Sequence, residues 1–526
     1  MKKIKKLAAV LCVAAMLTGC GQGKGTVNST AGSSASGSKT YDGATVITLS
    51  DKGIQVDGEA ISEDDTQAVY AAKDIVFYLE GQSFTYGEGT EEDAHSQAEA
   101  DAHTVVHITE PGSYVLSGKL SKGQIAVDLG EDAEEDAEAV VTLILNGVDI
   151  TCSVAPAVIF YNVYECGSDD AETATKDVDT SKAGANVLIA DDSVNNVSGS
   201  YVARIYKPYE LNETGTAVVD SKKLHKYDAA FYSKKSMNVN GDEEGSGILN
   251  IVAENEGLDS ELHLTINGGN INITSGNDGI NTNEDGVSVT TVNGGTLNIK
   301  VDGKTGEGDG IDSNGWLVIN GGTVIAEACS FSADAGIDSD MGIHINGGNV
   351  IATGNMLDRF SESTQNYAVF AFASTQKGGQ TYSLKNEAGE VVFEYIPEND
   401  FTYLAISSEQ LTAGTYTFWN GKNQLAGSTS GMMGGMMGMP GGFGGMQRPE
   451  GMTPPEGMEI PNGGRGQGGT RPEGFNGQMP EGFNGQRPEG FEGFGGFGGM
   501  ADGEVTKQFV IADGGNYFSN VTKAEQ

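Results

Sequence analysis

The middle of the chain carries a set of acidic and amide residues whose spacing suits the binding of a metal ion. Four short segments of the type Gly-Ile-Asp-Ser, or a close variant, occur between residues 257 and 339, and each has Asp or Asn at its third position. In the later segments a further aspartate stands three or four residues before this position. The seven candidate ligands are Asp259, Asp278, Asn281, Asp309, Asp312, Asp334 and Asp338.

These segments are expected to be strands, in which successive side chains point to opposite faces. The Ile and Ser residues then share one face, and Asp259, Asn281, Asp312 and Asp338 form an outward column on the other. Strands of neighbouring turns lie about 4.8 Å apart, and two carboxylates at that separation repel by roughly 3.5 kcal/mol at an effective dielectric near 20. The column therefore requires a cation, and flexible oxygen-only coordination favours Ca²⁺ over Zn²⁺ or Mg²⁺.

A second interpretation of the same residues requires no metal. Asp and Asn side chains beside glycine often cap turns through local hydrogen bonds to the backbone. Acids recur at two positions per turn rather than at one, and this favours the calcium hypothesis. The capping alternative stays open at this point.

The candidate ligands lie within a repeat that must position them. The sequence Asn-Gly-Asp stands at 240–242, and Asn-Gly-Gly follows at 267–269, 293–295, 320–322 and 346–348, so the intervals alternate between 27 and 26 residues. A β-branched run precedes and follows each Asn-Gly pair, and a third short segment lies between repeats. Three short strands per turn at a fixed period indicate a solenoid with inward Ile, Val and Leu.

Two other architectures compete with this interpretation. A leucine-rich repeat needs Leu at several fixed positions and a helical back side, whereas the apolar positions here are mostly Ile and Val, with no amphipathic helix between the glycines. A β-sandwich would need hairpins with two-residue turns and no strict period. We therefore predict an all-β chain with a right-handed parallel β-helix over 44–360.

After residue 360 the period fails. Runs typical of antiparallel strands predict a C-terminal β cap over 361–430, which a solenoid needs to close its last turn. Residues 431–500 consist largely of Gly, Met and Pro and contain one β-branched aliphatic residue, Ile460, so they are predicted to be disordered. Residues 501–526 contain a strand-like run that should return to the cap as its last strand.

The N-terminus resembles a bacterial lipoprotein signal. A Lys-rich start is followed by the apolar run Leu7–Leu17 and by Leu-Thr-Gly-Cys ending at Cys20, and the apolar run is too short to span a membrane. The resemblance implies a signal peptide over 1–19 and lipid attachment to Cys20, with residues 20–43 as a Gly/Ser/Thr-rich tether. We expect an exported chain held by lipid on the extracellular face of the cell membrane. An ordinary secretory peptide is the alternative.

Charge and cysteine content exclude several classes of protein. The chain has 31 Lys and Arg against 73 Asp and Glu in 526 residues, a net charge of −42. Such an excess of acid argues against binding to nucleic acid or to an anionic membrane surface. Five scattered cysteines, of which Cys20 is expected to carry lipid, do not form a disulfide framework.

Several segments together resemble a known family. They include "ITEPGSYVLSGKLSKGQIAVDLG", "VTLILNGVDIT", "LNIVAENEGLDSELHLTINGGNINI" and "GDGIDSNGWLVINGGTVIA". They are similar to the carbohydrate-binding-domain lipoproteins of anaerobic Gram-positive bacteria, over about 44–360. The resemblance implies a parallel β-helix similar in fold to the family 9 pectate lyases, bound calcium ions, and binding to cellulose or pectin.

The sequence favours binding over catalysis. A polysaccharide lyase needs a Lys or Arg base beside its calcium, and Lys300 and Lys304 lie one turn from the column with no Arg nearby. We therefore predict calcium-dependent, non-catalytic binding of acidic or cellulosic polysaccharide at the cell surface by a monomer. A pectate lyase of the same fold and a structural adhesion protein are the two alternatives.

Overall fold

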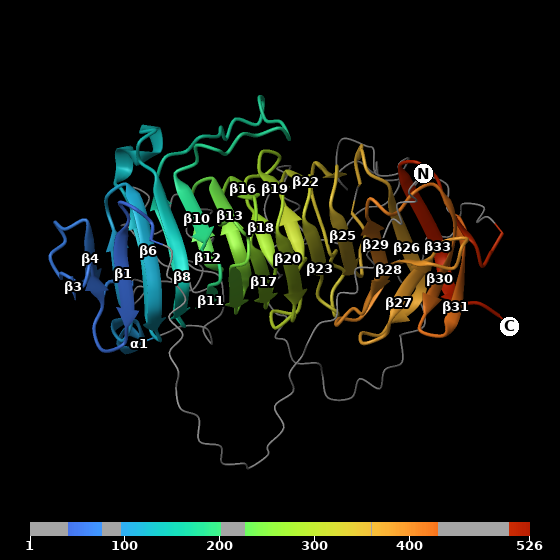
Figure 1. The fold of residues 1–526 in the computed structure, drawn as a ribbon, viewed down its shortest axis with the longest axis horizontal. Helices are drawn as coiled ribbons and strands as arrows, with labels where there is room; N and C mark the ends of the chain where they lie inside the picture. Colours follow the sequence, from blue (N-terminus) through green and yellow to red (C-terminus); the bar gives the residue numbers. More distant parts are fainter. Residues whose placement is uncertain (1–39, 76–95, 201–226, 359, 430–503, 526) are drawn as a thin grey trace, which may run out of the picture.

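The computed structural model describes residues 40–75, 96–200, 227–358, 360–429 and 504–525. The predicted signal peptide, most of the predicted tether and the Gly/Met/Pro-rich segment 431–500 lie outside the described residues. Within them almost all of the regular secondary structure is β-strand, and the prediction of an all-β protein is confirmed. Figure 1 shows the strands of successive repeats side by side along the long axis of the molecule.

Three stacks of parallel strands run through the repeat region. Each repeat adds one strand to each stack, and the strand pairs with the equivalent strand of the next repeat; the last repeat adds only an isolated bridge at Ile337 to the third stack. Stack 1 contains β10 (Ala185–Ile189), β13 (Met237–Gly241), β16 (His263–Ile266), β19 (Val289–Val292), β22 (Trp316–Ile319) and β24 (Gly342–Ile345). Stack 2 contains β11 (Val194–Gly199), β14 (Ile248–Ala253), β17 (Asn270–Ser275), β20 (Thr296–Val301), β23 (Thr323–Glu327) and β25 (Asn349–Gly354).

Stack 3 forms a separate sheet. It contains β5 (Thr104–Ile108), β7 (Gly123–Asp128), β9 (Val158–Asn162), β12 (Ala229–Ser233), β15 (Glu256–Ser260), β18 (Ile280–Thr282) and β21 (Ile311–Ser313). β4 (Val69–Ala72) adds to it as an antiparallel edge strand.

The first strands of the chain begin stacks 1 and 2. Two long strands, β6 (Gly112–Leu120) and β8 (Val141–Thr151), run through both stacks, and β8 pairs with β10 and with β11. β1 (Thr45–Ser50) pairs with β6 and carries a small antiparallel extension, β2 (Gln55–Val56) and β3 (Glu59–Ala60).

Alternation of side chains along these strands builds one continuous core. In stack 1, Leu264 and Ile266 of β16 are buried, and Leu317 and Ile319 of β22 are buried at equivalent positions. Equivalent Ile, Leu and Val residues of the other two stacks belong to the same buried cluster. Burial of branched apolar side chains on every turn is what the repeat contributes to stability.

The Asn-Gly-Gly triplets form the turns between stacks 1 and 2. In the triplet at 293–295, Gly295 has φ of 80°, a conformation that favours glycine, and a Cβ at Gly294 would lie 2.9 Å from the carbonyl oxygen of Asn267. Both glycines are thus required for close stacking of the turns. The asparagines of successive turns hydrogen-bond to one another, and we call this row the amide ladder: Asn240, Asn267, Asn293, Asn320 and Asn346.

Antiparallel strands follow the repeats. β29 (Phe401–Ser407) pairs antiparallel with β25, the last strand of stack 2, and with β26 (Tyr367–Gln376). The remaining strands of this part are β27 (Tyr382–Lys385), β28 (Val391–Tyr395), β30 (Gly414–Asn420), β31 (Asn423–Thr429), β32 (Phe509–Ile511) and β33 (Gly515–Lys523). They enclose a second core rich in phenylalanine. The two last strands of the chain therefore complete a sheet begun more than a hundred residues earlier.

Helical structure is minor. The described residues include the α-helix α1 (Gln97–Asp101) and the 3₁₀-helix η3 (Glu131–Glu135). No helix in the described part of the chain is long and apolar enough to cross a membrane.

Candidate functional site

The strand register of stack 3 brings the predicted column together. Asp259 of β15 lies opposite Asn281 of β18, and Asn281 lies opposite Asp312 of β21. A bridge between Ile311 and Ile337 continues this register, so Asp338 follows Asp312 in the same line. The four residues thus lie in one row although 22 to 31 residues separate neighbours in the sequence.

The second set of predicted acids lies in the turns that lead into stack 3. The backbone N–H of Asp309 donates to Asp278 Oδ1 at 2.6 Å, and that of Ala335 donates to Asp309 Oδ1 at 2.5 Å. The N–H of Gly308 donates to Asp334 Oδ2 at 2.7 Å. One oxygen of each of these carboxylates therefore caps a turn of a neighbouring repeat, the following one for Asp278 and Asp309 and the preceding one for Asp334. Turn capping and metal binding are compatible here, because a carboxylate has a second oxygen.

The candidate ligands are less accessible than an outward column on an open surface would be. The exposed fraction is 0% for Asp259, 8% for Asp278 and 9% for Asn281. Asp312 and Asp338 are partly exposed. The burial arises because further polar side chains pack on the same face. Asn283 donates to Asp259 Oδ1 at 2.8 Å, and Asn281 donates to Glu256 Oε1 of β15 at 3.0 Å.

Burial and mutual repulsion make the ionised form of these acids unfavourable. Burial, and then the neighbouring charge of Asp278, raises the pKa of Asp309 to about 10. Burial is also the main cause that raises the pKa of Asp312 and of Asp338 to about 8, with neighbouring aspartates adding to it. The pKa of Asp278 is raised well above its ordinary value by burial and by Glu256. At neutral pH these groups need either protons or a cation.

The basic side chains of the described residues do not neutralise this set. Within the described part of the chain, no ion pair with a basic side chain involves Asp278, Asp309, Asp312 or Asp338. Buried charges are otherwise paired or bound to metals, so the row has the electrostatic character of a cation site.

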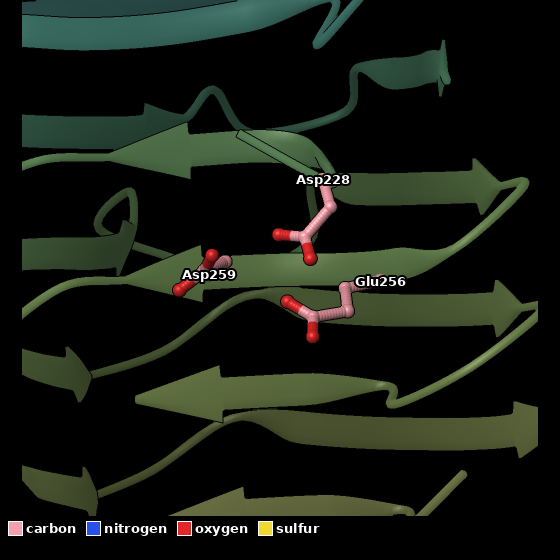
Figure 2. Close-up of side chains that lie close together, drawn as sticks. All are labelled: Asp228, Glu256 and Asp259. Atoms are coloured by element: carbon pink, nitrogen blue, oxygen red, sulfur yellow. The ribbon is translucent and has the colours of Figure 1, made fainter. Parts of the chain in front are cut away.

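The structure adds acids that were not predicted as ligands. Asp228, Glu256 and Asp259 each offer one carboxylate oxygen, and these three atoms lie within 4.8 Å of one another. Figure 2 shows them together, with Asp228 just before β12 and the other two on β15. All three side chains are buried.

A sequence signal for Glu256 existed. Glu256 stands three residues before Asp259, the same offset that separates Asp278 from Asn281 and Asp309 from Asp312. A pattern restricted to aspartate does not include it. Asp228 has no such signal, because a long connection separates it from β11 and its position follows from the pairing of β12 with β15. Near the other end of the row, Asp340 and Asp358 raise the pKa of Asp338 and were also missed.

The donor set fits a hard cation. The ligand atoms are carboxylate and amide oxygens, which suit Ca²⁺ better than Zn²⁺. The side-chain oxygen Oδ1 of Asn281 has no hydrogen-bond partner within the described residues, and Asn281 lies in the row between Asp259 and Asp312. A buried acceptor left without a donor is costly, and a cation at this position would satisfy it.

Comparison with known proteins places the chain in a family. A solved structure, a polysaccharide lyase-like protein from C. thermocellum in a gadolinium derivative, is 19% identical with a TM-score of 0.33, covering 61% of this chain and 97% of that one. Comparison with curated proteins gives no match. A family model described as "Carbohydrate-binding domain-containing protein" matches residues 102–388, more than half of the 526 residues. The chain therefore belongs to the family of carbohydrate-binding domain-containing proteins.

Proposed function

We propose that the chain binds polysaccharide and that calcium ions held by the acidic row of stack 3 are required for binding to acidic glycans. The observation that carries the proposal is that Asp278, Asp309, Asp312 and Asp338 lie together at stack 3, that burial raises their pKa values, and that no basic side chain of the described residues forms an ion pair with them. They belong to a chain of the carbohydrate-binding domain family. Calcium supplies the positive charge that these carboxylates lack. The ligands that we assign to it are Asp259, Asp278, Asn281, Asp309, Asp312, Asp334 and Asp338, joined by Asp228 and Glu256.

We further propose that the three stacks form a right-handed parallel β-helix. The in-register parallel pairing of each repeat with the next supports this architecture. In such a solenoid the turns and outer faces of successive coils form rows of identical groups along the axis. A polymer with a regular repeat is a natural ligand for such rows.

The glycan that we propose is plant-type polysaccharide, either pectin-like polygalacturonate or cellulose. With a net charge of −42, the protein repels a polyuronate unless a cation lies between the two. Calcium in the acidic row provides that bridge. A cellulosic chain carries no charge and does not require it.

Binding without degradation is the expected outcome of a pull-down on insoluble glycan. The mature chain should sediment with polygalacturonate in millimolar Ca²⁺ and remain in the supernatant in EDTA. Unsaturated uronate, measured by its ultraviolet absorbance, should not be released at a rate typical of enzymes. Failure to sediment with polygalacturonate and with cellulose would favour the structural adhesion alternative. Calcium-dependent release of unsaturated oligouronates would move the protein to the lyases.

The contacts of two lysines support the non-catalytic assignment. The ammonium group of Lys300 pairs with Glu398, and that of Lys304 pairs with Asp302 at 3.0 Å. A lysine that acts as a base must be neutral and close to the proton that it removes. Both lysines are instead paired with acids outside the predicted row.

The proposed location is the extracellular face of the membrane, with Cys20 carrying the lipid. Replacing Cys20 by Ser should abolish incorporation of labelled fatty acid and move the protein from the membrane fraction to the medium or to an uncleaved precursor, because a serine has no thiol to acylate. The measurement is fluorography of cells grown with a labelled fatty acid. A Cys12→Ser variant is the matched control and should be labelled like the parent; equal labelling of the Cys20→Ser variant would contradict the anchor.

A further inference from the structure

A polar groove lies on the outer face of stack 1, on a different side of the repeats from the acidic row. Its volume is about 470 Å³, within the range typical of ligand pockets. Its floor is formed by equivalent outward positions of successive strands, among them Asn238, Thr265, Thr291 and Val318. One wall is the amide ladder from Asn267 to Asn346.

The other wall comes from a distant part of the chain. Residues 176–181, in the long connection between β9 and β10, line the groove. This connection, teal in Figure 1, extends over the later repeats. Thr180 Oγ1 lies 2.8 Å from Asn238 Oδ1 and 2.7 Å from Thr265 Oγ1, and Asn238 donates to the carbonyl oxygen of Thr180 at 2.7 Å. These buried contacts hold the wall at one end of the groove and leave the later rungs accessible.

The amide ladder presents a regular array of hydrogen-bonding groups to this groove. Asn293 donates to Asn267 at 2.9 Å and accepts from Asn320 at 2.9 Å. A carboxamide has two N–H donors and two acceptor lone pairs, so the ladder uses one of each. Each rung retains one donor and one acceptor in an orientation fixed by its neighbours, and successive rungs are about 4.8 Å apart.

The groove carries little charge for a protein of this composition. Lys176 pairs with the adjacent Asp177 at 2.7 Å, which leaves Asp179 as the remaining acid of the lining. A polyuronate would meet this net negative charge without a cation to bridge it. Neutral amides and hydroxyls instead match the hydroxyl groups of an uncharged sugar, each of which both donates and accepts.

We propose that this groove binds a neutral, extended polysaccharide chain, of the cellulosic type, along the axis of the repeats. An extended β-linked glucan advances per sugar by a distance close to the spacing of the strands, so each sugar meets an equivalent rung. The three intervals of the amide ladder from Asn267 to Asn346 span about 14 Å, which accommodates about three sugars. The inference rests on the proposal that the chain binds polysaccharide. It assigns neutral glycans to the groove on stack 1 and acidic glycans to the acidic row of stack 3.

The test is a calorimetric titration of the full mature chain with cellohexaose. Removing two ladder amides with Asn293→Ala and Asn320→Ala should weaken binding about tenfold, since two hydrogen bonds are lost. The matched control is Asn272→Ala with Asn298→Ala. These residues form an equivalent ladder on stack 2, in which Asn298 donates to Asn272 at 2.9 Å outside the groove. The control should bind like the parent.

A second pair of variants tests the groove without altering either ladder. Thr291→Arg on the groove floor should abolish cellohexaose binding by obstruction, and Thr274→Arg on the outer face of β17 should have no effect; melting curves identify any misfolded variant. Binding in EDTA should equal binding in calcium. This inference is wrong if the parent binds polygalacturonate but not cellohexaose. It is also wrong if the double variant Asn293→Ala/Asn320→Ala and the variant Thr291→Arg both fold and bind cellohexaose like the parent. In either case the proposed function stands. If the parent binds neither glycan, the proposed function is wrong as well.

Discussion

Chelation of calcium is expected to lower the melting temperature of the mature chain by roughly 4–8 °C. A ligand that binds only the folded state raises the free energy of unfolding in proportion to the logarithm of the ratio of ligand concentration to dissociation constant. Millimolar Ca²⁺ at a site with a micromolar dissociation constant therefore contributes about 4 kcal/mol. One kcal/mol shifts the midpoint by about 1–2 °C in a domain of this size. Without the ion, the carboxylates that oppose stacking of successive turns are Asp278, Asp309, Asp312 and Asp338.

The measurement is differential scanning calorimetry in 1 mM Ca²⁺ and in EDTA. Magnesium is the control: it demands rigid octahedral coordination and gives up its water reluctantly, so it should restore little of the lost stability. An unchanged midpoint in EDTA would mean that the acids of stack 3 are turn caps alone and that calcium has no place in the structure.

The sequence was sufficient to predict this row because two regularities coincide in it. A segment of the Gly-Ile-Asp-Ser type recurs once in each repeat, and side chains alternate along a strand, so Asp259, Asn281 and Asp312 are predicted to share a line although 22 and 31 residues separate them; the strand register agrees. Neither regularity predicts burial. The low exposure of Asp259 depends on Asn283 and on the neighbouring acids, which reach it only in the folded chain.

The groove on stack 1 illustrates what periodicity cannot predict. The Asn-Gly-Gly period was visible, but the hydrogen bonds between asparagines of successive turns depend on the geometry of stacking. The second wall, residues 176–181, lies about 60 to 170 residues from the rungs that it faces and belongs to no repeat. Its place follows from the contacts of Thr180 with Asn238 and Thr265, and such contacts have no sequence pattern.

The Glu256 position shows a different limit. The offset of three residues is present in the sequence, but the predicted pattern contains only aspartate at this position. Glutamate offers the same oxygen ligands on a longer side chain, and at the start of β15 this length brings its carboxylate to Asp228. A pattern defined by chemistry rather than by residue name would have included it.

Replacement of Asp312 by Asn is expected to have opposite effects with and without calcium. In EDTA the variant should be more stable than the parent by about 2 kcal/mol at pH 8, because the amide removes a charge that burial and the neighbours Asp278 and Asp340 disfavour. In saturating calcium it should be less stable than the parent, because a neutral amide binds the ion more weakly than a carboxylate does. A residue that only caps a turn would give the same sign in both conditions.

The pH dependence provides an independent measure of the same charge. The pKa of Asp312 is raised from 3.8 to about 8 in the folded chain, so the metal-free fold binds this proton more tightly than the unfolded chain does. The resulting stability is fully present below about pH 4 and is lost as the pH rises through about 8. The parent in EDTA should therefore lose stability between pH 5 and pH 8, and Asp312→Asn should lose less, by urea unfolding at each pH.

A matched control distinguishes this effect from the loss of any one acid. Asp149 is an exposed carboxylate that pairs with Lys119 at 2.7 Å on the outer face of β8, and Asp149→Asn should change the free energy of unfolding by less than about 1 kcal/mol in either condition. If Asp312→Asn destabilises the protein equally in calcium and in EDTA, the charge of Asp312 is already compensated in the metal-free fold. The row would then owe its form to hydrogen bonds between turns rather than to a bound cation.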